Sequence, residues 1–492
     1  MPDMTRKFRT VDYDKSLQQT VTIAECLPPD HLARFTVDVI AMLDLSAVYA
    51  QYAPRGGVPY APEILLGLLF YGYATGVFSS RKIERATHES IPFRFIAGGL
   101  HPDHDTIANF RKTFLPEITE LFVQVLLVAK EADVLKLGNI SLDGSKIHAD
   151  ASKSKAVSYK RLLKLERGLR VEVDELLALS EQVDQGQLPE RLNIREEIVF
   201  RQQRLVNLAQ AKAVLEMRAG ERYQVEKAAY EAKLRKREEK AKRTGRKPRG
   251  RKPKPPEPGP RDKDQYNFTD PESRIMKNST NGGFDQHYNV QVAVEHESFL
   301  VVANTLSNHA TDHGEAIPTL DAIPAKVGKP KAGALDAGYF SEHNITQMEL
   351  RGIEPYIATG REPHHKSWKA RFAEASAPPS KDASPRVKMA YKLKTEIGKA
   401  VYRLRKSTVE PVIGIIKEVL GFRQFSLRGL AAAAGEWCLV CLAFNLKRLH
   451  VLLAGQLQRP LGVLTICPKH CRWVAESLMR LEKAQIEAQV GV

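Results

Sequence analysis

The chain has few cysteines and lacks the sequence signals of several common protein classes. Its five cysteines are an odd number, and no signal peptide or transit sequence is recognisable, so we expect a reducing, cytosolic environment. No nucleotide-binding loop is present in the sequence. The strongly apolar stretch at 64–73 is too short to span a bilayer, and its Gly67 and Gly72 suit close helix packing, which predicts a core helix.

Cysteine and histidine spacing near the C-terminus suggests zinc at first sight. Cys438 and Cys441 are separated by two residues and are followed by Cys467, His470 and Cys471. The first two lie in an apolar, helix-like run, where a free cysteine packs as a small hydrophobic side chain. Packing is therefore the favoured interpretation, and structural zinc is the minor alternative.

Positive charge is concentrated in one segment. The chain of 492 residues exceeds the size at which single cores stop growing, and its formal charge of +16 indicates a polyanionic partner. Residues 233–254 contain thirteen Lys or Arg against two Glu, and such a run would bind phosphates with a strong dependence on salt. Within it, residues 248–253 resemble the AT-hook core, in which Arg249 and Arg251 would lie along the minor groove of A·T-rich DNA. A basic, Pro-rich disordered linker is the alternative.

A helical insertion precedes and includes this basic segment. Leucine or valine recurs at 162, 169, 176 and 183, which is a seven-residue repeat, and a second helical pattern runs from Ile194 through Leu215. The two patterns predict an antiparallel helical hairpin within an insertion at 155–267, between one strand near 140 and a strand pair at 287–295 and 298–306. The hairpin would contact DNA or a second protomer, or serve as a structural spacer.

Three carboxylates stand where a fold can bring them to one metal site. Asp143 and Asp336 follow short apolar runs, so we expect each at the end of a buried strand, and we expect Glu410 at the start of a helix. Oxygen-only ligands suit Mg²⁺ or Mn²⁺, and such groups can clamp two ions about 3.5 to 4 Å apart for phosphoryl transfer. For either Asp alone, an ordinary turn is the alternative. His148 is expected to be an ordinary strand residue.

These residues resemble those of the DDE transposases of bacterial insertion sequences, which carry an RNase H-like catalytic domain. In that family, tyrosine, arginine, glutamate and lysine recur at fixed helical spacing. Lys417 follows Glu410 by seven residues, as the pattern requires, and Lys406 fills the basic slot four residues before it. Tyr402 and Arg405 each lie one residue earlier than the pattern expects. The resemblance implies that these four residues contact DNA, although a solvated helix face is the alternative for the lysines.

The resemblance covers most of the chain and implies its organisation. It extends over segments 62–66, 71–73, 79–84, 102–112, 287–295, 421–429 and 444–447, the first four of which resemble the N-terminal domain of InsH-like transposases. The fold class implied is α/β, with an RNase H-like mixed sheet flanked by helices, an all-α N-terminal domain and the helical-hairpin insertion. The domains would be residues 1–135, residues 136–450 interrupted by 155–267, and a C-terminal helical tail at 451–492.

A second DNA contact is expected in the N-terminal region. Asp105 and Thr106 precede a helical pattern that would present Asn109, Arg111 and Lys112, as a recognition helix does in the major groove. An ordinary surface helix is the alternative.

The resemblance implies a cytosolic, nucleoid-associated DNA transposase that cuts element ends and transfers strands with two Mg²⁺ or Mn²⁺ ions held by Asp143, Asp336 and Glu410. Its partners would be the terminal inverted repeats, target DNA and further copies of the chain, as a homodimer or higher assembly. No covalent protein–DNA intermediate is needed, so Tyr402 should not be a nucleophile. Two other classes stay open, a metal-dependent nuclease of the same fold and a non-catalytic DNA-binding protein derived from a transposase.

Overall fold

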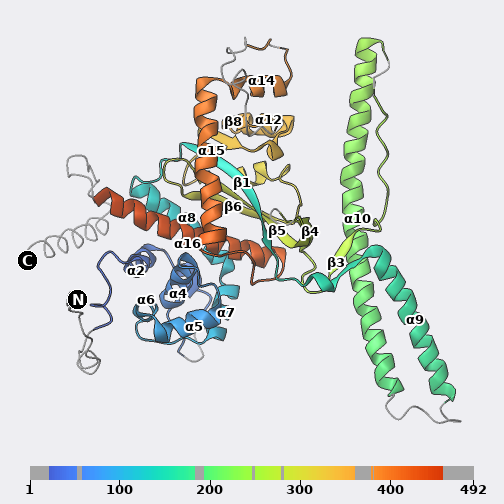
Figure 1. Ribbon diagram of the computed structural model, residues 1–492, viewed down its shortest axis with the longest axis horizontal. Helices are drawn as coiled ribbons and strands as arrows, with labels where there is room; N and C mark the ends of the chain where they lie inside the picture. The colour runs from blue at the N-terminus through green and yellow to red at the C-terminus, as the bar shows by residue number, and fades with distance from the viewer. Residues whose placement is uncertain are drawn as a thin grey trace, which may run out of the picture. The chain divides into compact units, whose positions relative to one another are not determined.

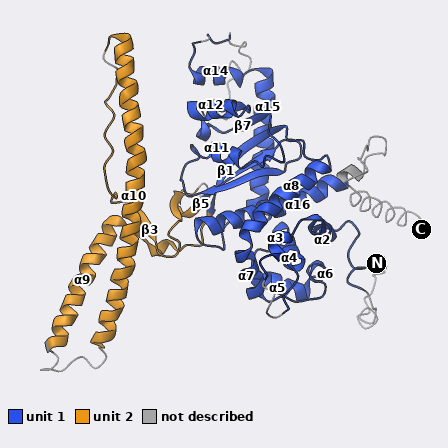
Figure 2. Ribbon diagram, turned by 180° about the vertical axis from the view of Figure 1, so that it is seen from behind, with its two compact units in different colours: residues 1–147, 288–492 blue, residues 148–287 orange. Residues whose placement is uncertain are grey.

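Most of a mixed sheet, together with its surrounding helices, forms the larger of two units in the computed structural model (Figure 1). The structure describes residues 22–52, 58–182, 193–246, 250–278, 282–360, 378–380 and 382–457. The core unit comprises residues 1–147 and 288–492, and the hairpin unit comprises residues 148–287 (Figure 2). The domain boundaries expected from the sequence stay predictions.

The sheet joins parallel and antiparallel strands in the order β4-β5-β1-β7-β8, with β6 also pairing with β5. Its strands are β1 (Asn139–His148), β4 (Arg274–Lys277), β5 (Phe284–Glu295), β6 (Val301–Ser307), β7 (Ala332–Leu335) and β8 (Glu354–Ile357). β1 is parallel to β7 and β7 to β8, whereas β5 is antiparallel to β4 and β6. All four residues of β7 are buried, as expected for a central strand covered on both faces. The mixed α/β sheet and the predicted strand pair are therefore confirmed.

The N-terminal part of the core unit is helical, as predicted. Its helices are α2 (Leu32–Met42), α3 (Ser46–Tyr49), α4 (Pro62–Ala74), α5 (Ser80–Glu89), α6 (Ile91–Ile96), α7 (His104–Thr113) and α8 (Leu115–Glu131). The apolar stretch forms α4, which is buried along nearly its whole length and packs against α2 and α16 (Leu430–Leu457). A Cβ at Gly67 would press on Ile96, so this glycine permits the close helix contact that the sequence suggested.

Helix α16 connects the N-terminal helices to the sheet. It packs against α4, α8 and β6, and it contains Cys438 and Cys441, both buried (Figure 1). By length and composition, Leu430–Ala454 would be able to cross a membrane, but 67% of its most apolar stretch is buried inside the structure. It is therefore a core helix. The packing role predicted for these two cysteines is confirmed, whereas Cys467, His470 and Cys471 lie outside the described residues.

Helix α15 (Glu396–Gly414) packs against β7 and β8 and continues into a π-helical turn at Ile415–Val419. Val401 of this helix lies in a buried cluster with Ala332 and Ala334 of β7. The remaining helices of the core unit include α11 (Ala316–Asp321), α12 (Glu342–Leu350) and α14 (Pro385–Lys392). The predicted C-terminal tail begins inside α16, and its residues 458–492 lie outside the described residues.

The hairpin unit confirms the predicted pair of helices. Its elements are β2 (Ala156–Ser158), α9 (Tyr159–Gln182), α10 (Ile194–Thr244) and β3 (Gln265–Asn267), and β2 pairs with β3. Leu162 and Leu169 of α9 pack against Leu208 and Leu215 of α10, which is the contact that the seven-residue repeat predicts. The basic segment beyond α10 is bound to the helix, because Arg237 donates to the carbonyl oxygens of residues 250 and 251.

Candidate active site

Two of the three predicted carboxylates follow equivalent positions on neighbouring parallel strands. Leu142 of β1 is paired in register with Leu335 of β7, so Asp143 and Asp336 come next on the two strands. β7 ends before Asp336, as predicted, and the Asp336 carboxylate accepts a hydrogen bond from the Gly338 N–H at 3.2 Å. The prediction that β1 ends at Asp143 is wrong. The strand continues to His148, because residues beyond Asp143 remain paired within the sheet.

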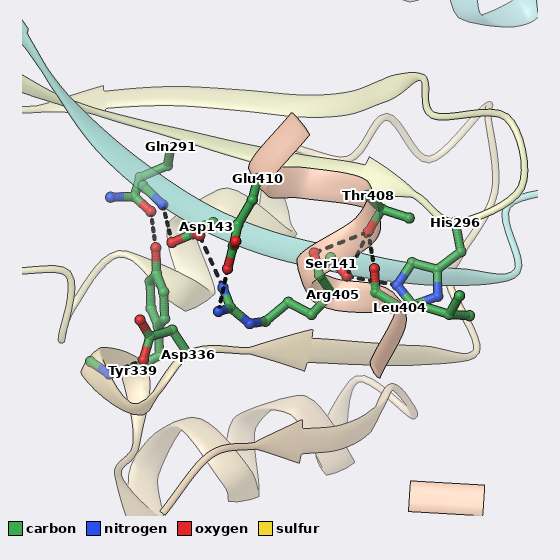
Figure 3. Close-up of polar contacts among 12 residues, drawn as sticks. Ser141, Asp143, Gln291, His296, Asp336, Tyr339, Leu404, Arg405, Thr408 and Glu410 are labelled. Carbon is green, nitrogen blue, oxygen red and sulfur yellow. Dashed lines mark hydrogen bonds and ion pairs between the residues drawn. The ribbon is translucent and has the colours of Figure 1, made fainter. Parts of the chain in front are cut away.

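The third carboxylate, Glu410, lies near the C-terminal end of α15, so the prediction that it opens a helix is wrong. The helix begins earlier, where the Thr395 side chain caps it. Arg405 of the same helix connects two of the acids: its Nη1 lies 3.0 Å from Asp143 Oδ2 and its Nη2 lies 2.8 Å from Glu410 Oε1 (Figure 3). The Arg405 side chain is only 7% exposed, and its guanidinium lies 5.9 Å from the centre of the Tyr402 ring. One buried cation thus joins a strand carboxylate to a helix carboxylate.

The pKa of Asp143 shows that the three acids act on one another. The pKa of Asp143 is raised to about 6, chiefly by burial and in smaller part by the charges of Asp336 and Glu410, against the opposing effects of Arg405 and of a hydrogen bond from the Gly144 N–H. Burial opposes the charge of Arg405 itself, but the neighbouring acids outweigh burial and raise its pKa. The cluster holds three acids against this one buried cation, so it favours further positive charge.

A polar network on β5 supports both strand carboxylates. The Gln291 Nε2 donates to Asp312 Oδ1 at 2.9 Å. The Gln291 Oε1 accepts from the Tyr339 hydroxyl (Figure 3). Tyr339 belongs to the 3-10 turn at Ala337–Tyr339 that Asp336 caps. A Cβ at Gly144 would overlap the Gln291 amide, so glycine beside Asp143 leaves room for this amide in its present position. Sequence reasoning missed this network, although Gln291 stood in a predicted strand in which polar and apolar residues alternate up to Val292.

A second buried network fixes α15 against β1. Ser141 Oγ contacts His296 Nε2 at 2.7 Å, and Thr408 Oγ1 donates to Ser141 Oγ at 3.2 Å and to the Leu404 carbonyl oxygen at 2.8 Å (Figure 3). Ser141 lies two residues before Asp143, and Thr408 lies two residues before Glu410. The network therefore sets the spacing between the strand acid and the helix acid. Sequence reasoning missed it too, because its three polar residues carry no local spacing signal.

The predicted basic residues on α15 have different surroundings. Lys406 is exposed to solvent. The cation that contacts Glu410 is the neighbouring residue, Arg405. Lys417 is half-buried, and its Nζ donates to Ser145 Oγ at 3.1 Å, two residues beyond Asp143. Burial lowers the pKa of Lys417. The π-helical turn interrupts the regular helix before Lys417, so the single straight stripe that the sequence suggested is not formed.

The other predicted DNA-binding residues lie elsewhere. In α7, Asn109 and Lys112 are exposed. Arg111 is buried, and its Nη1 lies 2.8 Å from the Tyr73 hydroxyl and 3.8 Å from Glu436 Oε1, so the structure does not support a DNA contact by Arg111. The helix starts at His104 and is capped by Asp103, two residues before the Asp105 that the sequence suggested. In the hairpin unit, Arg251 is exposed and Arg249 lies outside the described residues.

The three acids fit hard divalent cations by donor type, since carboxylate oxygens are the ligands that Mg²⁺ and Mn²⁺ prefer. Within the described part of the chain, however, no three His, Cys, Asp or Glu side chains are already arranged to hold a metal ion. Arg405 takes up the oxygen atoms of Asp143 and Glu410 that would face each other. The donors are therefore present, and the guanidinium stands between them.

Two segments of the chain match family models of transposases. Residues 21–113 match the model described as Transposase domain (DUF772), and residues 377–450 match the model described as Transposase DDE domain. The first match spans α2 to α7, and the second spans α14, α15 and most of α16, with Arg405 and Glu410. The comparison with curated proteins and the comparison with solved structures each gave no match.

Proposed function

Because the chain belongs to the DDE transposases of insertion sequences, we propose that it cuts DNA at the ends of its element and joins those ends to target DNA. We also propose that Asp143, Asp336 and Glu410 are the catalytic acids of an RNase H-like core. The observation that carries this proposal is geometric: Arg405 contacts both Asp143 and Glu410, and the strand register places Asp336 beside Asp143 on the adjacent parallel strand.

The proposed roles follow from the position of each side chain. Asp143 and Asp336 lie next to each other in the strand register, and Glu410 faces Asp143 across the Arg405 guanidinium, so the three would hold divalent ions between sheet and helix. When bound, two Mg²⁺ or Mn²⁺ ions supply activation of water or of a DNA 3′-hydroxyl and stabilisation of the leaving oxygen. The same acids would serve cutting and joining, because both are in-line attacks on a phosphodiester.

Cations around the acids would balance the charge of the DNA backbone. Lys417 bonds to Ser145, two residues beyond Asp143 on β1, and exposed Lys406 lies one helical turn before Glu410, so both can approach a phosphate near the acids. Tyr402 is half-buried and would assist binding rather than act as a nucleophile. We further propose that the basic segment around Arg251 and the exposed residues Asn109 and Lys112 add DNA contacts, and that the protein acts in the cytosol as a dimer or larger assembly on DNA.

Strand transfer from a pre-cut end tests this proposal against a plain nuclease. Purified full-length protein would be mixed with Mg²⁺, a labelled duplex that ends in a free 3′-hydroxyl at the element terminus, and supercoiled target plasmid. We expect joined products with wild type and none with Asp336→Asn. Asp133→Asn is the matched control, because Asp133 is 84% exposed and asparagine tolerates its positive φ of 55°. Cleavage without joining would identify a nuclease. The absence of both cleavage and joining would indicate a non-catalytic DNA-binding protein.

A further inference from the structure

The Arg405 guanidinium divides its two terminal nitrogens between two different acids. Nη1 contacts Asp143 Oδ2 at 3.0 Å and Nη2 contacts Glu410 Oε1 at 2.8 Å (Figure 3). An arginine that serves only as a structural partner commonly directs both nitrogens to one carboxylate. Here the positive group lies between the two carboxylates, which is where a bridging metal ion would lie. The arginine therefore performs the charge balance that a divalent ion would otherwise provide.

The bonding of Arg405 is incomplete. Its Nε is buried and has no hydrogen-bond partner among the described residues, whereas both terminal nitrogens are bonded. A buried donor without a partner costs free energy, so the guanidinium depends on its two ion pairs to stay in place. The half-buried ring of Tyr402, 5.9 Å from the guanidinium, offers a neighbouring position for a displaced cation.

Arginine and metal would compete for the same two carboxylates. A divalent ion held by Asp143 and Glu410 would lie close to the groups that now accept from Arg405, and two positive groups at such short range repel each other. Within the described residues, the absence of three acids already arranged for a metal agrees with this competition. Lys417 differs, because its ammonium group bonds to the Ser145 hydroxyl and the Lys146 carbonyl oxygen, both on β1, rather than to Asp143 or Glu410.

We propose that Arg405 is an exchangeable internal cation, which neutralises the site in the metal-free protein and must leave Asp143 and Glu410 before a divalent ion binds them. This inference rests on the proposed function, since it takes the same acids as metal ligands. The site would then have two states. In the closed state Arg405 contacts Asp143 and Glu410, and in the open state these acids are free to bind a divalent ion. The inference also accounts for a DNA-contacting role of Arg405, because the buried guanidinium becomes free for a phosphate only in the open state.

The test is Mn²⁺ binding to the full-length protein without DNA, measured by calorimetry. We expect Arg405→Gln to bind Mn²⁺ about tenfold more tightly or better, because an open state populated at about 10% or less weakens the apparent affinity by at least that factor. Arg403→Gln is the neutral control, since Arg403 is exposed on the same helix. Lys417→Gln controls for charge alone, since it removes a positive charge near the acids without freeing their oxygens.

Three results would overturn the inference. Unchanged or weaker Mn²⁺ binding by folded Arg405→Gln would show that arginine does not compete, and an equal gain in Lys417→Gln would assign the effect to general electrostatics. Should Arg405→Gln fail to fold, Arg405→Lys replaces it, because one ammonium group reaches fewer oxygens than the forked guanidinium and should also raise the affinity. No Mn²⁺ binding in wild type or any variant, with Asp143→Asn unchanged, would remove the proposed metal site itself.

Discussion

Mildly acidic pH should destabilise the core unit through one buried histidine, His296. This residue is 7% exposed and contacts Ser141 Oγ, and burial lowers its pKa from 6.5 to about 4. Between pH 6.5 and pH 4, the unfolded chain binds a proton that the folded chain does not, so stability falls as the pH falls through this window. At 1.36 kcal/mol for each pKa unit, about 2 kcal/mol of stability is lost between pH 7.5 and pH 5.

Urea unfolding followed by tryptophan fluorescence measures this loss, because Trp437 is buried in the core unit. His296→Gln keeps a hydrogen-bonding group toward Ser141 but cannot be protonated, so its stability should depend less on pH by about the same 2 kcal/mol. His343→Gln is the matched control, since His343 is exposed on α12. Equal acid sensitivity in wild type and His296→Gln would refute the reasoning.

Two further substitutions test the buried networks. Thr408→Val removes the hydroxyl that joins α15 to β1, so it should lower the free energy of unfolding by about 1 kcal/mol and slow DNA cleavage. Ser407→Ala, at an exposed neighbouring position, should do neither. Equal losses in the two variants would contradict the role of Thr408 in spacing the two acids. Arg111→Ala leaves Glu436 buried without its cation and should cost about 3 to 5 kcal/mol of stability. Lys112→Ala should instead weaken DNA binding and leave urea unfolding unchanged, and a reversal of these two outcomes would restore Arg111 as a DNA contact.

The sequence predicted elements with a strong periodic signal better than it predicted their ends. The seven-residue repeat identified the contact of Leu162 and Leu169 with α10, because hydrophobic spacing sets which helix faces meet. The helix start at Glu396 was missed because its cap, Thr395, lies fifteen residues before Glu410 in a segment without clear periodicity. The strand beyond Asp143 was missed because a glycine there suggested a turn, whereas it admits the Gln291 amide.

The polar contacts of the site depend on residues far apart in the sequence. Arg405 was assigned to DNA from its helical spacing, yet its partner Asp143 lies 262 positions away and comes into contact only through the packing of α15 near β1. Arg111 was also assigned to DNA from its place on a helix, yet it pairs with Glu436 of a helix distant in the sequence. The residues next to an arginine in the sequence do not tell whether its side chain is exposed or buried. The sequence suggested the three acids as candidates, and the tertiary structure shows a cation between two of them, Asp143 and Glu410.

The most direct test of the proposed active site is to measure metal-dependent DNA cleavage by the Asp143→Asn variant. With Mg²⁺ and a duplex carrying the element end, the account predicts cleavage reduced on the order of 10³-fold or more, since a bound metal supplies several kcal/mol of charge stabilisation, with DNA binding retained. Glu396→Gln, at a position 91% exposed on α15, should cut as wild type does. Undiminished cleavage by Asp143→Asn would contradict the assignment of these acids as the active site.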